Sequence, residues 1–296
     1  METEAFKEFE YLAWQRAVED YDHYFSPLTK QTVGPLLDAV EAGSNKALLD
    51  VASGPGYVTA EAHRRGARAT GIDFSEVMLA KAKRLHPTLN FSLGDAEQLP
   101  FGDSEFDAVV MNFGILHLAQ PEVAIREVYR VLRHKGRFAF TVWAKPEEGV
   151  GFAIALRAIE ALGNANIALP QGPPFFRFSD STECVTVLEA AGFVNVAVVQ
   201  LPLTWKLNSA GDLFDAFYRG SARMGGLLTR TARGGAYGHP GGISQKRRPV
   251  RTKWTFTASH ARTRRYSAEI IGVFPRPDTI FQKGWRAPRQ NHPPRK

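Results

Sequence analysis

The feature of this sequence that most constrains its fold is a repeated alternation of apolar runs and helical patterns between residues 47 and 143. Apolar runs typical of buried strands occupy 47–52, 67–72, 89–93, 106–112 and 137–143, and helical patterns between them occupy 58–65, 75–85 and 122–132. Such repetition predicts an α/β fold with a buried, mainly parallel sheet. Open sheets of this kind bind ligands at the carboxyl ends of their strands.

Further elements are expected on both sides of this repeat. Two helical patterns precede it at 9–24 and 33–40, so we expect residues 1–45 to form an N-terminal helical lid. The main domain is expected to span 46–228, with a Gly- and Pro-containing insertion at 144–178. After the insertion we expect a helix opened by a capping box at Asp180 and Glu183, strands at 194–199 and 203–207, and a final helix at 210–228.

The charge of the chain is divided unevenly along its length. The whole chain carries +7, but residues 229–296 hold 16 lysines and arginines and only two acids, so this segment carries +14 and residues 1–228 carry −7. No leucine follows Leu228. A segment so charged and so poor in apolar residues is expected to be irregular and disordered rather than a packed domain. The abrupt change after about Arg230 suggests the hypothesis that this tail comes from an altered reading frame, a retained intron or a mispredicted gene end.

Composition excludes several classes of protein. Cys184 is the single cysteine, which excludes an intramolecular disulfide framework and a cysteine-based zinc site, and no other metal-ligand cluster stands out. The acidic start does not resemble a signal peptide, and the longest apolar stretch, 108–116, is about half of what a membrane span requires. We therefore expect a cytoplasmic protein without a membrane span.

A glycine turn follows the first expected strand, where Asp50 precedes Gly54 and Gly56. The glycines allow a ligand to approach the backbone, and the helix that follows presents free N–H groups. A dinucleotide site would place a third glycine at position 59, but the chain has Thr59 there, so a nucleoside ligand without pyrophosphate fits better. Taken alone, the motif is equally compatible with an ordinary tight turn.

Two further acids follow the next two strands. Asp73 ends the second strand, where a carboxylate can bind both hydroxyls of a ribose; the alternative is a helix N-cap. Asp95 follows the third strand, where it could accept the exocyclic amine of an adenine; the alternative is an ordinary turn aspartate.

Five motifs in order resemble a known family: LDVASGPG at 49–56, GIDFS at 71–75, GDAEQLPF at 94–101, FDAVVMNF at 106–113 and RVLRHKGR at 130–137. Together they resemble the class I S-adenosylmethionine-dependent methyltransferases, in particular the small-molecule group that includes the ubiquinone and menaquinone methyltransferases. The resemblance implies a Rossmann-like, doubly wound, seven-stranded and mostly parallel sheet with a reversed last hairpin. It also implies that the cofactor is S-adenosylmethionine.

Carried over position by position, the resemblance implies a set of cofactor-binding residues. These are Asp50, Ala52, Ser53, Gly54, Gly56, Asp73, Phe74, Met78, Asp95, Ala96, Asn112 and Phe113. Phe74 and Met78 would flank the adenine, and Asn112 and Phe113 would lie beside the methyl sulfonium. Ser53 stands where many relatives have cysteine or another small residue, which is a sterically mild departure.

A methyl donor of this kind demands little acid–base machinery, because the enzyme mainly holds the nucleophile in line with the methyl group and excludes water. For a hydroxyl or acidic-carbon acceptor, His117 is the candidate base; the alternative is a histidine that only packs or orients. Aromatic residues that could cover a planar acceptor include Tyr21, Trp143, Phe175 and Phe176, although such residues are often simply core.

Three functions remain open at this point. The first is methyl transfer to a small, aromatic or quinone-like acceptor at O, N or C. The second is nucleic-acid binding or RNA modification through the basic tail. The segment Asn112-Phe-Gly-Ile argues against base modification, because it lacks the Asn/Asp-Pro-Pro-aromatic tetrad of many base-modifying enzymes. The third is a noncatalytic cofactor-binding protein, which the three acids disfavour.

Overall fold

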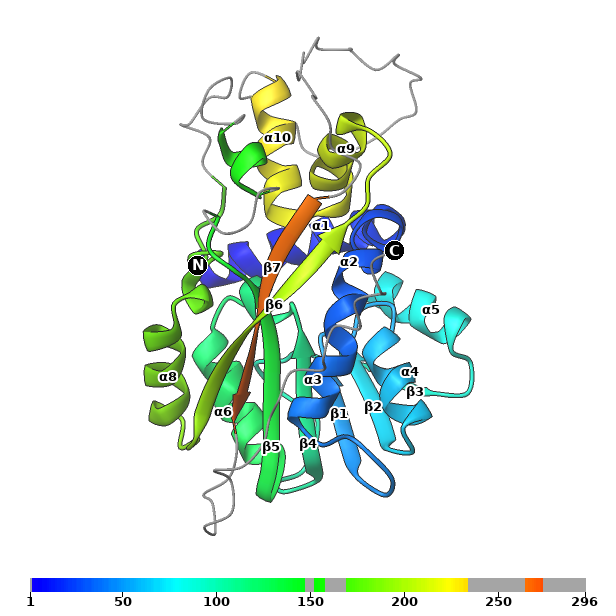
Figure 1. The fold of residues 1–296 in the computed structure, drawn as a ribbon, viewed down its shortest axis with the longest axis vertical. Coiled ribbons are helices and arrows are strands. Elements are labelled where there is room, and N and C mark those ends of the chain that lie inside the picture. The colour runs from blue at the N-terminus through cyan, green and yellow to red at the C-terminus, as the bar shows by residue number, and fades with distance from the viewer. Residues whose placement is uncertain (1, 147–151, 158–168, 234–263, 274–296) are drawn as a thin grey trace, which may run out of the picture.

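The computed structural model describes residues 2–146, 152–157, 169–233 and 264–273. These residues form one twisted sheet with helices on both faces, capped at one end by further helices (Figure 1). The strands are β1 (Ala47–Val51), β2 (Arg68–Asp73), β3 (Asn90–Leu93), β4 (Phe106–Asn112), β5 (Leu132–Trp143), β6 (Val196–Trp205) and β7 (Arg264–Val273). Their order in the sheet is β3-β2-β1-β4-β5-β7-β6.

The first five strands pair in parallel, as the sequence predicts. The chain crosses between them through α4 (Tyr57–Arg64), α5 (Glu76–Leu85) and α6 (Pro121–Val131), which is the doubly wound, Rossmann-like arrangement. Because all five strands run in the same direction, β1, β2, β4 and β5 end along one edge of the sheet. That edge is the expected position for a ligand site.

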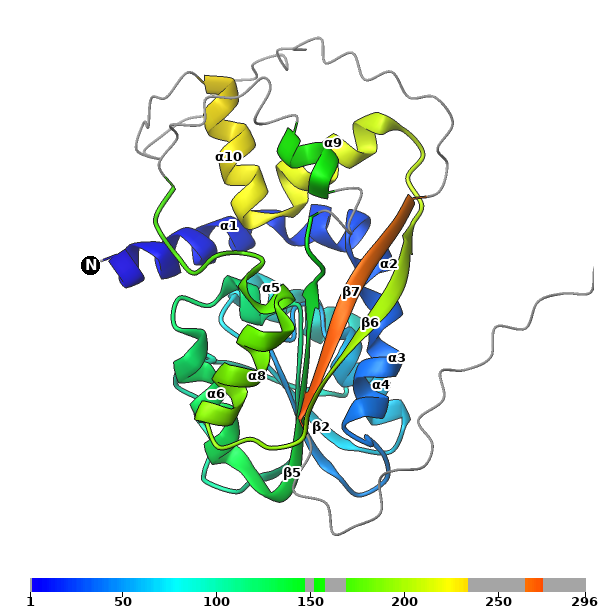
Figure 2. The same ribbon diagram turned by 60° about the vertical axis from the view of Figure 1, so that its left-hand side comes forward.

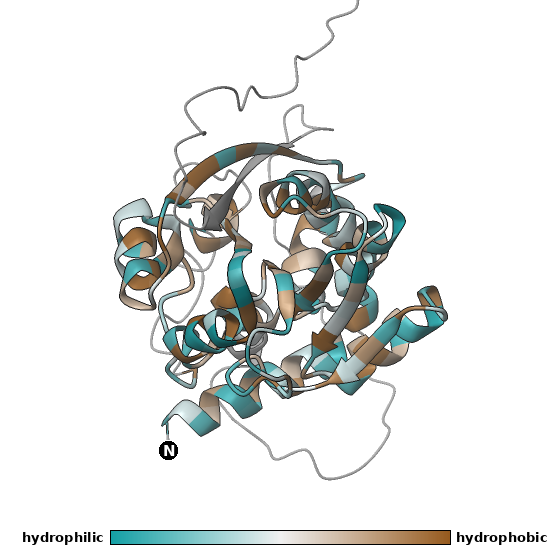
Figure 3. Cartoon of the chain, turned by 90° about the horizontal axis from the view of Figure 1, so that it is seen from below, coloured by the Kyte–Doolittle hydropathy of each residue, from teal (hydrophilic) through white to brown (hydrophobic). Residues whose placement is uncertain are grey.

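Both faces of the parallel sheet are buried, and alternate residues of each strand supply the two faces. In β1, Leu48 belongs to the core cluster that includes residues of α3 (Val33–Ala39) and α4, whereas Leu49 belongs to the cluster that includes residues of α6 and α8 (Ser181–Ala190). A parallel sheet needs this cover on both sides, so its strands are almost continuously apolar. Figure 3 shows hydrophobic stretches on strands in the interior, while the surrounding helices carry both hydrophobic and hydrophilic residues.

The antiparallel end of the sheet corrects two predictions. The strands expected at 194–199 and 203–207 are a single strand, β6, because Pro202 lies within a continuous ladder with β7. The partner β7 pairs antiparallel with both β5 and β6, and it comes from the segment that was expected to be irregular. Residues 264–273 thus form a strand through backbone hydrogen bonds to β5 and β6. Composition alone did not reveal this pairing.

Helices cover the carboxyl end of the sheet. The long α1 (Glu2–Tyr24) lies across it, followed by the short α2 (Ser26–Thr29), and α9 (Ala210–Gly220) and α10 (Ala222–Arg233) lie above α1 (Figure 2). The final helix expected at 210–228 is therefore two helices, because Ser221 has an extended backbone between them. Among the described residues, no helix combines the length and the apolar character that a membrane span requires.

Local capping explains where several of these helices begin. The Ser75 side chain accepts the Met78 N–H at the start of α5. Asp180 accepts the N–H groups of Thr182 and Glu183 at the start of α8, whereas the Glu183 carboxylate binds Arg177 rather than completing a capping box. The sequence therefore located this helix start correctly and assigned one side chain to the wrong partner.

Two glycines of the turn after β1 have left-handed backbones, with φ of 51° at Gly54 and 83° at Gly56. A Cβ on Gly56 would lie 2.5 Å from Cζ of Phe91, whereas a Cβ on Gly54 would meet nothing within 4 Å. We expect Gly56→Ala to lower the free energy of unfolding by about 2–4 kcal/mol, and Gly54→Ala by only about 1 kcal/mol. Urea unfolding of both variants measures this, and equal losses would contradict the steric argument.

Candidate functional site

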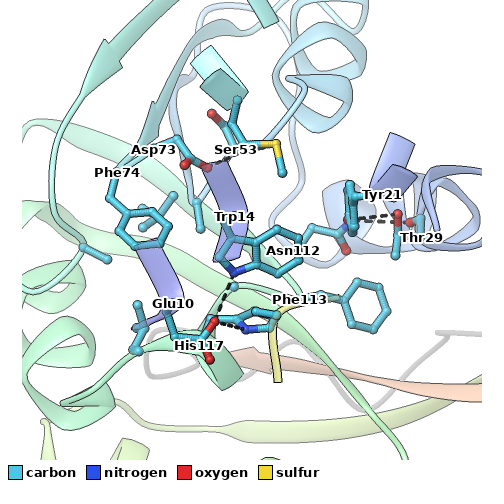
Figure 4. A pocket seen from close by; sticks show the side chains of 18 of the residues that line it. Glu10, Trp14, Tyr21, Thr29, Ser53, Asp73, Phe74, Asn112, Phe113 and His117 are labelled. Atoms are coloured by element: carbon cyan, nitrogen blue, oxygen red, sulfur yellow. Dashed lines mark hydrogen bonds and ion pairs between the residues drawn. The ribbon is translucent and has the colours of Figure 1, made fainter. Parts of the chain in front are cut away.

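A pocket opens at the carboxyl ends of β1, β2, β4 and β5, between the sheet and the covering helices α1 and α10 (Figure 4). Its empty volume is about 1460 Å³, part of which is open to solvent. The lining is polar along the glycine turn and aromatic beside the ends of β4 and β5.

Asp50, near the end of β1, is an almost completely buried carboxylate that lines the pocket. Its Oδ2 accepts the backbone N–H (3.0 Å) and the hydroxyl (2.7 Å) of Thr59, the residue that replaces the third glycine. Burial raises the pKa of Asp50 to about 7, although the bonds from Thr59 oppose the rise. Asp50 Oδ1 and the Ser53 hydroxyl are buried without a hydrogen-bond partner among the described residues. A ligand with N–H or O–H groups would satisfy both.

Asp73 lies at the end of β2 on the same side of the pocket. Its Oδ2 accepts the N–H of Gly54 at 2.8 Å, and its Oδ1 accepts the N–H of Ser75 at 2.9 Å. The N-cap of α5 is Ser75, so Asp73 itself does not cap this helix. Burial raises the pKa of Asp73 to about 6 in spite of the bonds from Ser75 and Gly54. No described lysine or arginine pairs with Asp50 or Asp73, so this end of the pocket favours a cationic ligand.

Asp95 is not a free hydrogen-bond acceptor. Its Oδ1 accepts the N–H of Glu97 at 2.8 Å, as a turn aspartate does, and its Oδ2 lies 2.9 Å from Nζ of Lys7. Lys7 also reaches Oε2 of Glu97 at 2.7 Å. Burial lowers the pKa of Lys7, but hydrogen bonds to Glu97 and Asp95 outweigh it, and the net pKa is raised. The first turns of α1 are therefore tied to the expected adenine end of the pocket.

The apolar residues expected around an adenine line the same end. Phe74, Met78 and Ala96 all face the pocket. Met78 is buried against Trp14 of α1, and Phe74 meets the Tyr11 ring edge-on at 6.0 Å. Ala52 and Gly54 line the pocket as well, whereas Gly56 lies behind it, at the N-cap of α4.

Asn112 and Phe113 end β4 at the centre of the pocket. Asn112 Oδ1 lies 2.7 Å from the hydroxyl oxygens of both Thr32 and Thr141, so the amide joins the 3₁₀ helix η1 (Lys30–Thr32) to the sheet. Phe113 has a φ of 56°, an uncommon conformation for a residue with a side chain, and its ring stacks on Trp143 at 4.1 Å. This backbone turn directs the chain from the sheet toward His117.

His117 contacts Glu10, which in turn contacts Arg223, and the sequence singled out neither of these charged residues. Its Nδ1 lies 3.0 Å from Oε2 of Glu10, which is 1% exposed, and Oε1 of Glu10 accepts Nε of Arg223 at 2.9 Å. Arg223 also donates to the carbonyls of Leu116 (2.8 Å) and Pro173 (2.7 Å). We call Glu10, His117 and Arg223 the roof cluster, because Glu10 belongs to α1 and Arg223 to α10, the helices above the sheet. Figure 4 shows Glu10 beside His117.

Aromatic rings form the wall beside the roof cluster. Tyr21, Trp143 and Phe175 line the pocket as expected, together with Trp14. Tyr21 stacks on Phe25 at 6.0 Å, and burial raises the pKa of its phenol to about 12, so it is a neutral group at ordinary pH. Phe176, which was also expected at the acceptor, does not line the pocket and packs edge-on against Phe152 at 5.5 Å.

Sequence reasoning missed Lys7, Glu10, Glu97 and Arg223. Glu10 looks like one of several solvated acids at the start of the chain, and only its position four residues before Trp14 marks the same helical face. Arg223 lies more than 200 residues away from Glu10, and no local pattern connects the two. The contact between Glu10 and Arg223 is a consequence of how α1 and α10 pack.

Comparisons with known proteins define the class of this site. Residues 49–140 match a family model described as a methyltransferase domain. A demethylmenaquinone methyltransferase of Streptomyces griseus is 32% identical over 168 residues, which cover 54% of this chain and 73% of the relative. One from Renibacterium salmoninarum is 34% identical over 139 residues, covering 46% of this chain and 59% of the relative. The chain spans about half to 60% of the length of the first curated relatives that it matches.

A solved structure supports the fold. The YcgJ protein from Bacillus subtilis superposes with a TM-score of 0.53 at 18% identity, covering 83% of this chain and 99% of that protein. The match to the methyltransferase domain and the similarity to these relatives assign the chain to a family, and the solved structure agrees with the fold. The chain belongs to the class I S-adenosylmethionine-dependent methyltransferases, and its cofactor is S-adenosylmethionine.

The residues at the polar end of the pocket fit this cofactor. S-adenosylmethionine carries an amino group, a sulfonium cation and two ribose hydroxyls. The pocket offers the unpartnered Asp50 Oδ1 and Ser53 hydroxyl, two carboxylates without a cationic partner, and open space above Gly54. Among the described residues, no group of three or more histidines, cysteines or acids could hold a metal ion.

Asp50→Asn is expected to stabilise the cofactor-free protein and to weaken cofactor binding. A pKa of about 7, against an ordinary 3.8, means that the wild type loses stability as the pH rises from about 4 to 7, because the unfolded chain releases this proton first. At pH 8 the amide should therefore add on the order of 2–4 kcal/mol to the free energy of unfolding, and little at pH 4.

Wild-type affinity for S-adenosylmethionine should fall on the order of 10- to 100-fold from pH 8 to 5.5, because a proton on Asp50 competes with the cation.

Urea unfolding and calorimetric titration measure both effects. Asp107→Asn is the matched control, because Asp107 is a β4 carboxylate with the opposite shift. Burial raises the pKa of Asp107, but the bonds from the Ala47 N–H and Arg133 outweigh it, and the net pKa is lowered. This control should lose stability at pH 8 and keep its affinity for the cofactor. A destabilised Asp50→Asn protein that still binds the cofactor would refute the assignment.

Proposed function

We propose that this enzyme transfers the methyl group of S-adenosylmethionine to a planar, mainly apolar small molecule such as a hydroquinone, at ring carbon or oxygen. One observation carries the proposal: a polar end that fits the cofactor and an aromatic wall that fits a flat ring belong to the same pocket. Two curated relatives are named demethylmenaquinone methyltransferases, which supports an acceptor of the quinone type.

Named residues take the cofactor roles in this proposal. Asp50, Ala52, Ser53 and Gly54 would hold the methionine part, Asp73 the ribose, and Phe74, Met78 and Ala96 the adenine. Asp95 would accept the adenine amine with carboxylate oxygens that already bind Lys7 and the Glu97 N–H. Gly56 contributes the shape of the turn rather than a contact with the ligand.

The chain itself would supply orientation and a water-free environment. When bound, the cofactor supplies a methyl group, whose bond to sulfur breaks with the electron pair staying on sulfur while a lone pair of the acceptor forms the new bond. Phe113 and Trp143, stacked on one another, would hold the acceptor ring next to Asn112. Holding two reactants in line contributes most of the rate in such transfers.

The domain division belongs to the same proposal. Residues 1–45 act as the lid, residues 46–228 form the methyltransferase domain with the insertion 144–178, and β7 completes a seven-stranded sheet as the strand between β5 and β6. Part of the insertion and most of the basic tail 229–296 lie outside the described residues.

Calorimetric titration and mass spectrometry test the function directly. We expect S-adenosylmethionine to bind the full chain, and Asp73→Ala to bind it at least 10-fold more weakly, because the ribose loses its carboxylate partner. With a reduced short-chain demethylmenaquinone as the acceptor probe, a product heavier by one methylene unit is expected. Absence of cofactor binding in the wild type would overturn the proposal.

The two adjacent phenylalanines provide a test of the acceptor wall. Phe175 lines the pocket and Phe176 does not, although both are partly buried in the same aromatic cluster. We expect Phe175→Ala to raise KM for the quinol probe about 10-fold through lost apolar contact, with little change in cofactor affinity. Phe176→Ala should leave KM within about twofold. Steady-state kinetics decide, and equal effects on KM would remove Phe175 from the acceptor wall.

A further inference from the structure

Three elements that are distant in sequence bring their charged groups together above the pocket. α1 supplies Glu10, the turn after β4 supplies His117, and α10 supplies Arg223. The carboxylate of Glu10 is almost completely buried, which is costly for a charge unless its oxygens are well bonded.

The two oxygens of Glu10 are well bonded. Oε1 accepts Nε–H of Arg223 at 2.9 Å, and Oε2 lies 3.1 Å from Nε1 of Trp14 and 3.0 Å from Nδ1 of His117. Burial alone raises the pKa of Glu10, but the attraction of His117 and Arg223 outweighs it and holds the pKa below its usual value. Glu10 is therefore an ionised carboxylate, which can only accept hydrogen bonds.

An accepting Glu10 fixes the tautomer of His117. Nδ1 must carry a hydrogen in order to bond to a carboxylate oxygen, so in the neutral ring Nε2 keeps its lone pair. No described residue bonds to Nε2, and Nε2 is not among the buried unpartnered atoms of the protein. His117 lines the pocket, where Trp14 and Phe175 meet its ring edge-on at 4.8 and 6.0 Å. The structure thus holds a basic nitrogen available to the pocket.

We propose that Glu10 and His117 act as a dyad, in which His117 Nε2 takes the proton of the methyl acceptor and Glu10 is the positioning residue that fixes the ring. This inference rests on the proposed function, because it requires an acceptor with an acidic hydroxyl beside the aromatic wall. Arg223 holds the Glu10 carboxylate in place and fastens it to the Leu116 carbonyl in the turn that carries His117.

The proton and the charges balance in this step. The acceptor hydroxyl gives its proton to Nε2, and the electron pair left on oxygen, or delocalised onto a ring carbon, forms the bond to the methyl carbon. For attack from carbon, the hydrogen on that carbon leaves as a proton while the ring oxygen regains one, so one proton is released in either case. The transfer removes one positive charge from the cofactor and creates one on His117, directly beside the Glu10 carboxylate.

A purely structural role of the roof cluster makes a different prediction. If Glu10 only ties α1 to α10, its replacement should lower stability and leave the protonation pattern of His117 unchanged. Glu10→Gln separates the two roles, because the amide oxygen should turn toward the Arg223 cation and the amide N–H₂ toward Nδ1. That arrangement moves the ring hydrogen to Nε2 and blocks proton uptake, as the amide variant of a serine-protease triad does with a loss of about 10⁴ in kcat.

The experiment combines ¹⁵N NMR of histidine-labelled protein with kinetics on the quinol probe. In the wild type we expect His117 to carry its hydrogen on Nδ1 when neutral, and in Glu10→Gln on Nε2. The kcat of Glu10→Gln and of His117→Ala should fall at least about 100-fold, while the affinity for S-adenosylhomocysteine, measured by calorimetry, stays within about threefold. Glu10→Asp should recover at least 10-fold of the loss, because a carboxylate is restored.

Glu19→Gln is the matched control, since Glu19 is an exposed α1 carboxylate paired with Lys81 and Arg84. It should change neither the tautomer nor kcat. The inference is overturned if wild-type His117 carries its hydrogen on Nε2, or if Glu10→Gln keeps kcat within threefold. The wild-type tautomer decides even if a variant fails to fold. Failure of the proposed function is a separate result, because it shows as a wild type that does not bind S-adenosylmethionine.

Discussion

The parallel pairing of β1, β2, β4 and β5 is the constraint on which the rest of this structure depends. Because these strands run in the same direction, Asp50, Asp73 and Asn112 reach one edge of the sheet from positions up to 62 residues apart. At that edge the side chains of Asp50 and Asp73 are almost completely buried. Two carboxylates therefore lie close together in a buried place, with pKa values raised to about 7 and 6.

These raised pKa values describe a site that is unfavourable without its ligand. Burial opposes the charge on Asp50 and Asp73, and no described cation compensates it, so a cationic cofactor gains the interaction that the protein lacks. The turn after β1 shows the same pattern, since Asp50 Oδ1 and the Ser53 hydroxyl are left without partners. Functional sites often keep such unsatisfied groups while the surrounding core provides stability.

The carboxylates at the covering helices differ from those at the sheet edge in having cationic partners. Lys7 joins Asp95 and Glu97, and Arg223 joins Glu10, so the carboxylates here have cationic partners. Each of these ion pairs crosses between α1 and another element, which makes the position of α1 depend on charge as well as on apolar packing. Ion pairs thus hold α1 over the pocket at both its expected adenine end and its acceptor end.

The amino-acid sequence predicted the strand and helix alternation, the glycine turn, and the positions of Asp50, Asp73 and Asn112, because these follow from local periodicity and from strand ends. It did not determine β7, whose order comes from pairing with β5 and β6. It also placed Phe176 in the pocket beside Phe175, although only the direction of each side chain decides which ring lines it. The Glu10–Arg223 contact was decided only by the tertiary structure, because an ion pair between residues 213 positions apart requires α1 and α10 to pack together, and no local pattern records that packing.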